Sequence, residues 1–236
     1  MDGIVLLAGK GTRVKSITPM GESKHSILID KKPMGWYSTN ILVQLGAKHI
    51  IFVINEEQES LAIQLGEMLN IKYSITVQKK SNGTPMGILS GLNKRKYLEE
   101  KYFVIFGDSY FNLTKEFISN MKQIEKPCII VQKKNRNDLK KSGVIEFNTE
   151  GEIISIEEKP DKPKGEYALR GLFIFDNSAK EKINSLKKSK RNEYEIIDLV
   201  SLYLKENNLT YLKFNNFGVD MGTPSGILKL LSFLKN

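Results

Sequence analysis

The sequence predicts an α/β fold in which a mixed, mostly parallel sheet is flanked by helices and followed by a smaller, β-rich part. Two observations lead to this prediction. Over about the first 133 residues, short apolar, β-branched segments alternate with segments whose apolar residues recur at helical spacing. From about residue 140, strand-like segments follow one another with short connections. The alternation is typical of parallel strands, because each of them needs a crossover connection, usually a helix.

The first part of the chain, residues 1–133, carries the alternating pattern. Strands are expected at Gly3–Leu7, His49–Val53, Lys72–Val77, Tyr102–Phe106 and Cys128–Val131. Helices are expected between them at Gly35–Leu45, Glu57–Leu69, Pro85–Tyr97 and Thr114–Lys122. This order predicts a Rossmann-like arrangement, with helices on both faces of the sheet.

The second part, residues 134–236, begins with strands expected at Gly143–Phe147, Ile153–Glu157 and Tyr167–Phe175. The first two read as a hairpin whose turn is Asn148–Gly151. After them we expect helices at Asn177–Leu186 and Tyr194–Glu206, a strand at Tyr211–Phe214 and a last helix from Pro224. Because no linker or repeat separates the parts, residues 1–236 are expected to form one domain with two lobes.

The composition excludes several classes of protein. No apolar stretch reaches the roughly 18 to 20 residues of a membrane span, and the N-terminus does not resemble a signal peptide. A single cysteine and two histidines leave no disulfide or His-rich metal site, so a cytoplasmic protein is expected. The net charge of +9 favours anionic partners. The lysines are scattered among glutamates, however, so nucleic-acid binding is not predicted.

A glycine-rich loop follows the first expected strand. Ala8 to Arg13 reads AGKGTR, and its glycines would let backbone N–H groups approach a phosphate. Arg13 could then bind phosphate oxygens with its guanidinium fork. The string is neither a Walker loop nor a dinucleotide fingerprint. A tight turn without a ligand remains the alternative.

Two carboxylates follow apolar segments and are flanked by small residues. Asp108 lies in Gly107–Ser109, and Asp220 lies in Gly218–Thr223. Carboxylates at strand ends lie at the edge of an α/β sheet where ligands bind. Together they could hold one Mg²⁺ that also binds substrate phosphates. Alternatively, each Asp could cap the N-terminus of a helix.

A charged string, Glu157-Glu158-Lys159-Pro160, stands at the end of another expected strand. A glutamate can accept hydrogen bonds from sugar hydroxyls, and a lysine can neutralise a phosphate. Taken alone, such a string is also typical of a solvated strand end.

In their order and spacing these strings resemble the sugar-phosphate nucleotidyltransferases, in particular the glucose-1-phosphate thymidylyltransferase type. The matching strings are Leu6–Arg13, Ser23-Lys24, Lys32–Met34, Val77-Gln78 with Gly83, Gly107-Asp108, Gly143–Phe147, Glu157–Pro160, Arg191–Asp198 and Asp220–Thr223. The resemblance covers nearly the whole chain. It implies transfer of a nucleoside monophosphate from a nucleoside triphosphate to a sugar 1-phosphate, with release of pyrophosphate.

The resemblance also implies roles for individual residues. Residues 1–133 would mainly bind the nucleotide, and residues 134–236 the sugar phosphate. Arg13 would bind the departing pyrophosphate and Lys24 the phosphates around the α-phosphorus, while Asp108 and Asp220 hold Mg²⁺. The implied nucleotide-binding residues are Leu6, Ala8, Gly9, Gly11 and Thr12, with Gln78 and Gly83 at the base. The implied sugar-phosphate residues are Gly143 and Glu158 at the sugar, and Lys159 and Arg191 at its phosphate.

The expected nucleotide is dTTP, with UTP as the first alternative and CTP or GTP as further ones. A nucleotide-sensing homologue without catalysis is the alternative of another class. The sequence departs from the family at His25, where Pro or Gln is usual, at Arg170, where a small residue is common, and at Asn192, where Gly is usual. Because only a short segment follows Thr223, a monomer or homodimer is expected.

Overall fold

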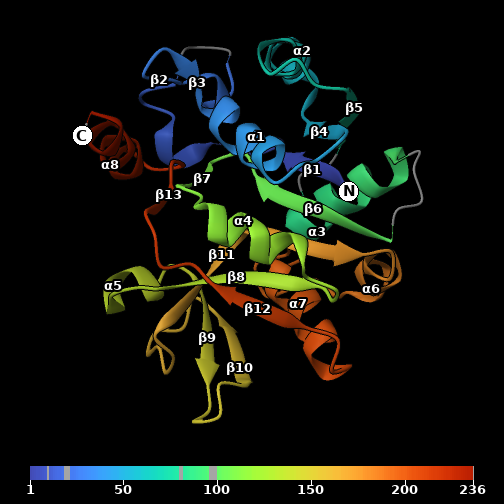
Figure 1. Cartoon of the computed structure of the whole chain (residues 1–236), viewed down its shortest axis with the longest axis vertical. Helices are drawn as coiled ribbons and strands as arrows, with labels where there is room; N and C mark the ends of the chain where they lie inside the picture. The colour runs from blue at the N-terminus through green and yellow to red at the C-terminus, as the bar shows by residue number, and fades with distance from the viewer. Residues whose placement is uncertain (10, 19–21, 80–81, 96–99, 236) are drawn as a thin grey trace.

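The computed structural model describes residues 1–9, 11–18, 22–79, 82–95 and 100–235. Its centre is a nine-stranded sheet in the order β10-β9-β11-β6-β1-β4-β5, with β8 beside β11 and β12 beside β8 (Figure 1). The strands are β1 (Asp2–Leu6), β4 (Ile50–Ile54), β5 (Tyr73–Val77), β6 (Lys101–Phe106), β8 (Cys128–Lys133), β9 (Gly143–Phe147), β10 (Ile153–Glu158), β11 (Tyr167–Asp176) and β12 (Thr210–Lys213).

The sheet divides into a parallel and an antiparallel region. β6, β1, β4 and β5 run parallel to one another, and β12 at the other side of the sheet runs parallel to β8. β11 runs antiparallel to β6, β8 and β9, and β9 forms the predicted hairpin with β10. Every residue of β4 is buried, as expected for a strand covered on both faces. The predicted α/β fold is confirmed.

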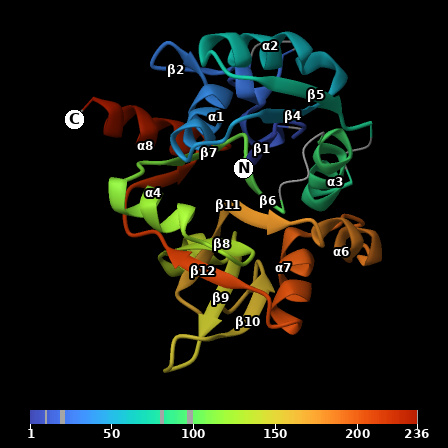
Figure 2. The same ribbon diagram turned by 45° about the vertical axis from the view of Figure 1, so that its right-hand side comes forward.

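Helices cover both faces of the sheet (Figure 2). Side chains of α1 (Met34–Gln44), α2 (Glu59–Met68) and α4 (Lys115–Lys122) pack into one apolar core. Side chains of α3 (Thr84–Lys94), α6 (Ala179–Ser185) and α7 (Ile196–Lys205) pack into the core on the other face. Shorter or peripheral helices are η1 (Thr12–Val14), η2 (Lys24–Ser26), η3 (Glu56–Gln58), α5 (Arg136–Leu139) and α8 (Pro224–Leu234). Within the described residues, none of the helices has the length and apolar character needed to cross a membrane.

The structure adds two small sheets that the sequence did not predict. β2 (Leu28–Ile29) pairs with β3 (Lys32–Pro33), and β7 (Ser109–Phe111) pairs with β13 (Gly218–Asp220). Strands of two or three residues are too short for a periodic signal, and the β7–β13 pairing joins segments more than a hundred residues apart. This second pairing matters for the site, because it brings the two halves of the chain together.

The predicted helices are present, with ends that differ from the prediction by up to three residues, and α3 and α7 are two of these. α3 ends at Lys94 rather than Tyr97, a residue that lies outside the described part of the chain. α7 begins at Ile196 rather than Tyr194, because Glu195 before it is extended (φ −98°, ψ 140°), and the backbone N–H of Tyr194 donates to the carbonyl of Asn82.

Candidate active site

A cavity of about 800 Å³ opens beyond the carboxyl ends of β1, β5 and β6, and extends to the end of β10. Most of the residues proposed from the sequence line it. They are Leu6, Ala8, Gly9, Arg13, Lys24, Gln78, Gly83, Asp108, Gly143, Glu158, Lys159, Arg191 and Asp220. Gly11 lies outside this lining, in the loop behind Lys24. The side chain of Thr12 and the whole of Lys10 lie outside the described structure.

The glycine loop folds over the side chain of Lys24. Gly11 has φ of 61°, a left-handed conformation that favours glycine. A Cβ on Gly11 would lie 3.0 Å from the Cβ of Lys24, and a Cβ on Gly9 would lie 3.3 Å from its Cε. The loop therefore packs closely against a cavity cation, which gives the glycines a role beyond forming a turn.

The two proposed metal-binding carboxylates face the same space. Asp108 lies between β6 and β7, and pairing of β7 with β13 sets Asp220 opposite Ser109. A Cβ on Gly222 would lie 2.6 Å from Oδ2 of Asp108 and 2.9 Å from Oδ1 of Asp220. Only a residue without a side chain leaves this space open. In the part of the chain that is described, no group of three or more His, Cys, Asp and Glu side chains gathers at one point, so the pair is the available donor set.

The structure excludes the alternative that these carboxylates cap helices. Asp108 is followed by strand β7, and the N-cap of α8 is Thr223, whose hydroxyl accepts a hydrogen bond of 3.1 Å from the backbone N–H of Gly226. Asp220 instead accepts a hydrogen bond of 2.7 Å from the N–H of Gly222, which orients the carboxylate.

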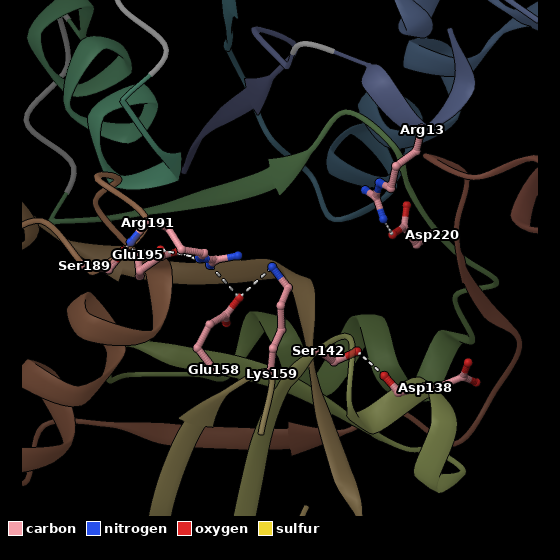
Figure 3. Close-up of polar contacts among 9 residues, drawn as sticks. All are labelled: Arg13, Asp138, Ser142, Glu158, Lys159, Ser189, Arg191, Glu195 and Asp220. Carbon is pink, nitrogen blue, oxygen red and sulfur yellow. Dashed lines mark hydrogen bonds and ion pairs between the residues drawn. The ribbon is translucent and has the colours of Figure 1, made fainter. Parts of the chain in front are cut away.

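We call Arg13, Lys24, Asp108 and Asp220 the inner end of the cavity. Nζ of Lys24 donates to Oδ2 of Asp108, and the two side chains are 10% and 12% exposed. Arg13 approaches Asp220 at 3.5 Å on the exposed side (Figure 3). Two cations thus face two carboxylates at this end, so its charge is balanced in the protein alone.

The two carboxylates of the inner end differ in acidity. Burial opposes ionisation of Asp108, but the adjacent Lys24 ammonium holds its pKa below the ordinary value. Burial and the negative charge of Asp108 raise the pKa of Asp220, against the effect of Arg13. When two carboxylates share a site, their pKa values move apart in this way, and a bound cation would relieve the repulsion between them.

We call Glu158, Lys159, Arg191 and Glu195 the outer end of the cavity. Oε1 of Glu158 is 3.1 Å from both Nζ of Lys159 and a terminal nitrogen of Arg191 (Figure 3). Arg191 also donates to Glu195 at 2.8 and 3.1 Å. Burial alone would lower the pKa of this guanidinium. The negative charges of Glu195 and Glu158 outweigh burial, so the pKa is raised. Glu195 had no role among the residues proposed from the sequence, because its pairing with Arg191 lies in an irregular segment before α7, where a spacing of four residues carries no signal.

Left-handed backbone conformations orient the side chains of the outer end. Lys159 has φ of 47° and its N–H donates to the carbonyl of Ser142 at 3.0 Å, so the chain turns sharply after β10. Asn192, next to Arg191, has φ of 60°. Asn tolerates this conformation better than most residues with a side chain. This explains how Asn can stand where the family usually has Gly.

Gln78 and Gly83 lie at the wall formed by β5 and α3. The N–H of Gln78 donates to the carbonyl of Ile54, and a Cβ on Gly87 would lie 3.1 Å from Oε1 of Gln78. Gly83 has φ of 107°, and a Cβ there would lie 2.1 Å from the carbonyl oxygen of Tyr194. Glycine is thus required at position 83 for the segment after Arg191 to approach α3.

Arg170 lies where β11 bulges relative to β8 and contributes to the cavity lining. Its guanidinium lies over the ring of Phe111, at 5.8 Å, and its buried Nε has no hydrogen-bond partner among the described residues. Burial lowers the pKa of Arg170, while Asp220, Asp108 and Asp138 act against that effect. The positive charge of Arg170 is therefore felt by the acid pair of the inner end.

A nucleotidyl transferase family model matches residues 2–236. With the fold and the site, this match shows that the chain belongs to the nucleotidyl transferase family, and the resemblance noted in the sequence is confirmed. The chain is 31% identical to the glucose-1-phosphate thymidylyltransferase of Neisseria meningitidis, over 100% of this chain and 83% of the relative. It is 30% identical to the enzyme of the same name from Mycobacterium tuberculosis, over 100% and 82%.

Solved structures agree in fold. A structure assigned as a glucose-1-phosphate thymidylyltransferase from Bacillus anthracis, in complex with sucrose, has a TM-score of 0.86 and 26% identity and covers 100% of this chain and 96% of that one. A UDP-glucose pyrophosphorylase structure with UDP-glucose has a TM-score of 0.85 at 20% identity and covers 99% and 98%. At that identity the second structure supports the fold alone.

Proposed function

We propose that this protein transfers a nucleoside monophosphate from a nucleoside triphosphate to a sugar 1-phosphate, giving a nucleoside diphosphate sugar and pyrophosphate. The observation that carries the proposal is one cavity with an acid pair and two cations at its inner end and two further cations at its outer end. Two phosphorylated substrates meeting in one cavity require this distribution of charge. The similarity to glucose-1-phosphate thymidylyltransferases supports it.

The reaction needs positioning more than proton transfer. A phosphate oxygen of the sugar 1-phosphate forms a bond to the α-phosphorus, and the bond from that phosphorus to the bridging oxygen of pyrophosphate breaks. The nucleophile is already an anion, so no general base is needed. Arg13 stabilises charge on the departing pyrophosphate, and Lys24 binds the phosphates around the α-phosphorus. Lys159 and Arg191 hold the sugar phosphate, while Glu158 and Gly143 bind the sugar.

The acid pair fits a divalent cation, and we propose Mg²⁺. Oxygens of Asp108 and Asp220 border the same open space above Gly222, and burial together with the negative charge of Asp108 raises the pKa of Asp220. Mg²⁺ is held by one or two carboxylates together with waters and substrate phosphates, so two protein ligands suffice. When bound, it would neutralise the phosphates and orient them.

We infer that dTTP is the preferred nucleotide. The amide of Gln78 matches thymine and uracil, because its carbonyl can accept from N3–H and its NH₂ can donate to O4. UTP lacks only a methyl group, a difference worth about 1–3 kcal/mol, so it is the nearest competitor. The similarity of this chain to proteins named glucose-1-phosphate thymidylyltransferase supports dTTP over UTP as its nucleotide. Gln78→Glu should damage the use of both, because a carboxylate would face O4.

We further propose that residues 1–236 act as one domain, with the nucleotide mainly on residues 1–133 and the sugar phosphate mainly on residues 134–236. The protein is expected to work in the cytoplasm as a monomer or homodimer, without nucleic acid. A nucleotide sensor without catalysis is disfavoured, since a sensor has no need for the acid pair, Arg13 and Lys159 together.

Pyrophosphate release tests the proposal. Each of dTTP, UTP, CTP, GTP and ATP is mixed with glucose 1-phosphate and its amino analogues, with and without Mg²⁺. We expect metal-dependent release with the highest kcat/KM for dTTP. A tenfold preference for CTP or a purine triphosphate would overturn the nucleotide assignment. Nucleotide binding without release from any pair would favour the sensor.

A further inference from the structure

Arg170 lies in the cavity wall without a partner for its charge. The side chain is half-buried, and its buried Nε has no hydrogen-bond partner among the described residues. In that part of the chain the guanidinium forms no ion pair either, and it lies over the ring of Phe111 at 5.8 Å. A charged group that loses water without gaining a partner costs free energy. An anion bound in the cavity would supply the missing partner.

The bulge in β11 places Arg170 between the two ends of the cavity. Before the bulge β11 pairs with β9, and after it β11 pairs with β6. On one side Leu169 lies against Gly143, where a Cβ would be 3.4 Å from the Cβ of Leu169. On the other side a Cβ on Gly171 would overlap Oγ of Ser109 at the start of β7. Arg170 therefore stands between the proposed sugar site and the inner end.

Lys140 and Lys141 extend the same wall. Both line the cavity, both are exposed, and neither forms an ion pair within the described residues. Leu139 before them packs against β11 in a small apolar core. The carbonyl of Ser142 after them accepts from the N–H of Lys159 at 3.0 Å. The backbone of the two lysines is therefore held between β11 and the outer end.

We call Arg170, Lys140 and Lys141 the basic wall, and its positive charge exceeds what the proposed reaction uses. The cations of the inner end serve the nucleotide phosphates, and those of the outer end serve the sugar phosphate. The basic wall has no anion assigned to it. Lys134, just after β8, shows the same excess of charge: burial, reinforced by Arg170 and opposed by Asp138, lowers the pKa of Lys134 to about 8.

We propose that the basic wall binds a carboxylate on the sugar ring, so that the preferred acceptor is a uronic acid 1-phosphate. The inference rests on the proposed function and names the acceptor of that same cavity. The anion belongs to the sugar, because β6, β1 and β4 lie between β11 and β5, which carries Gln78, proposed for the base, at its end. The guanidinium fork of Arg170 matches a carboxylate with two parallel hydrogen bonds, and its one charge balances the one charge of that group.

Matched acceptors separate the effect of charge from that of shape. Glucuronic acid 1-phosphate is compared with its C6 amide, which has nearly the same shape and no charge at C6. Galacturonic acid 1-phosphate and its amide form a second pair, and glucose 1-phosphate and glucose 1,6-bisphosphate complete the set. Pyrophosphate release with dTTP gives kcat and KM for each acceptor. Mg²⁺ is kept saturating, so that an effect of Arg170 on metal binding does not enter the comparison.

We expect the wild-type protein to prefer the acid of at least one pair over its amide by about 10- to 100-fold in kcat/KM, mainly through KM, because hydrogen bonds between charged groups are the stronger ones. Arg170→Met should reduce this preference to about threefold or less. Arg170→Lys, which keeps the charge without the fork, should retain part of it.

Two further variants complete the test. Joint replacement of Lys140 and Lys141 by Met should lower the preference by about threefold, since exposed charges are screened by water and salt. With Arg170→Lys, this double variant tests the prediction if Arg170→Met does not fold. Arg136→Met, an exposed position of α5 outside the cavity lining, is the control and should leave the preference unchanged.

Equal use of acid and amide in both pairs by the wild-type protein would overturn the inference, and so would an acid preference that Arg170→Met retains in full. Use of the bisphosphate roughly tenfold better than of either acid would assign the basic wall to a phosphate and overturn the carboxylate. The proposed function fails separately, when no acceptor, charged or neutral at C6, releases pyrophosphate with any nucleoside triphosphate. Release from glucose 1-phosphate without any preference for the acids would leave the proposed function standing and remove only the uronic acid.

Discussion

The two ends of the cavity hold similar charges in different surroundings. At the inner end, Lys24 of η2 and Asp108 after β6 form a pair that is 10% and 12% exposed, while Arg13 and Asp220 beside them are 60% and 44% exposed. At the outer end, Lys159 and Arg191 are each 45% exposed and come from a hairpin end and an irregular segment. Charges interact more strongly where water is excluded, and salt screens exposed pairs more than buried ones. We therefore expect the inner end to determine turnover and the outer end to determine affinity for the second substrate.

Replacing a carboxylate of the inner end should have the largest effect. Asp108→Asn removes one of two convergent metal ligands and leaves the buried Lys24 ammonium without its partner. We expect kcat to fall by at least about 1000-fold, and Tm to fall as well, because an unpaired buried charge is costly. Steady-state kinetics and thermal unfolding measure the two effects.

Asp30→Asn is the matched control, since it makes the same chemical change at an exposed turn whose left-handed φ of 44° suits Asn. Near-normal Mg²⁺-dependent turnover of Asp108→Asn would remove this residue from the proposed metal site.

Arg13 tests whether the inner end acts mainly in the transition state. Its guanidinium is 60% exposed and lies 3.5 Å from Asp220, so it is free to turn toward a departing pyrophosphate. Arg13→Ala should lower kcat by about 100-fold and change the KM for the sugar phosphate by less than about threefold. Lys15→Ala, an exposed cation in the same segment, should leave both constants unchanged. An effect confined to that KM would contradict the assigned role.

The outer end should respond in KM and in sensitivity to salt. Arg191→Ala removes the guanidinium that bridges Glu158 and Glu195. We expect the KM for the sugar 1-phosphate to rise by roughly 10-fold, with a weaker dependence of that KM on ionic strength than in wild type. Lys190→Ala serves as control, because it is an exposed neighbour that does not line the cavity. A loss that appears in kcat alone would mean that the outer end determines turnover rather than affinity for the sugar 1-phosphate.

Arg170 should give the smallest effect and tests the charge balance of the inner end. The guanidinium acts on Asp220 and Asp108 through space and therefore opposes binding of a cation there. Arg170→Met keeps the length of the side chain and removes the charge. The Mg²⁺ concentration for half-maximal rate should fall by about threefold. Arg136→Met, on the exposed surface of α5, should not change it. An unchanged or higher requirement for Mg²⁺ would show that the charge of Arg170 serves another group.

Much of the fold followed from local patterns. β4 and β5 lie within one residue of their predicted bounds, because apolar strands between turn signals are visible in sequence. The β7–β13 pair was missed, since three-residue strands gain their stability from a partner far along the chain. α7 starts two residues later than predicted, because Glu195 before it is extended.

Motifs likewise located the candidate site but not its geometry. The strings around Lys24, Asp108 and Asp220 pointed to phosphate and metal binding, yet the ion pair between Lys24 and Asp108 is a contact across 84 positions. Glu195 lies within a matching string, Arg191–Asp198, but the string did not show that it pairs with Arg191. The contact between Gln58 and Ser23 joins residues that only the folded chain brings within reach.

The sequence by itself determined which residue types are present and which local conformations they allow: the alternating elements, the glycines of the phosphate loop and the carboxylates after apolar strands. The tertiary structure decided which of these groups meet. Parallel strands bring their carboxyl ends to one edge, the β7–β13 pair sets Asp220 beside Asp108, and the left-handed Lys159 and Asn192 turn the outer cations toward the same cavity. The physical reason is that side-chain patterns act over a few residues, whereas an ion pair or a metal site depends on distances between segments that only packing of the whole chain fixes.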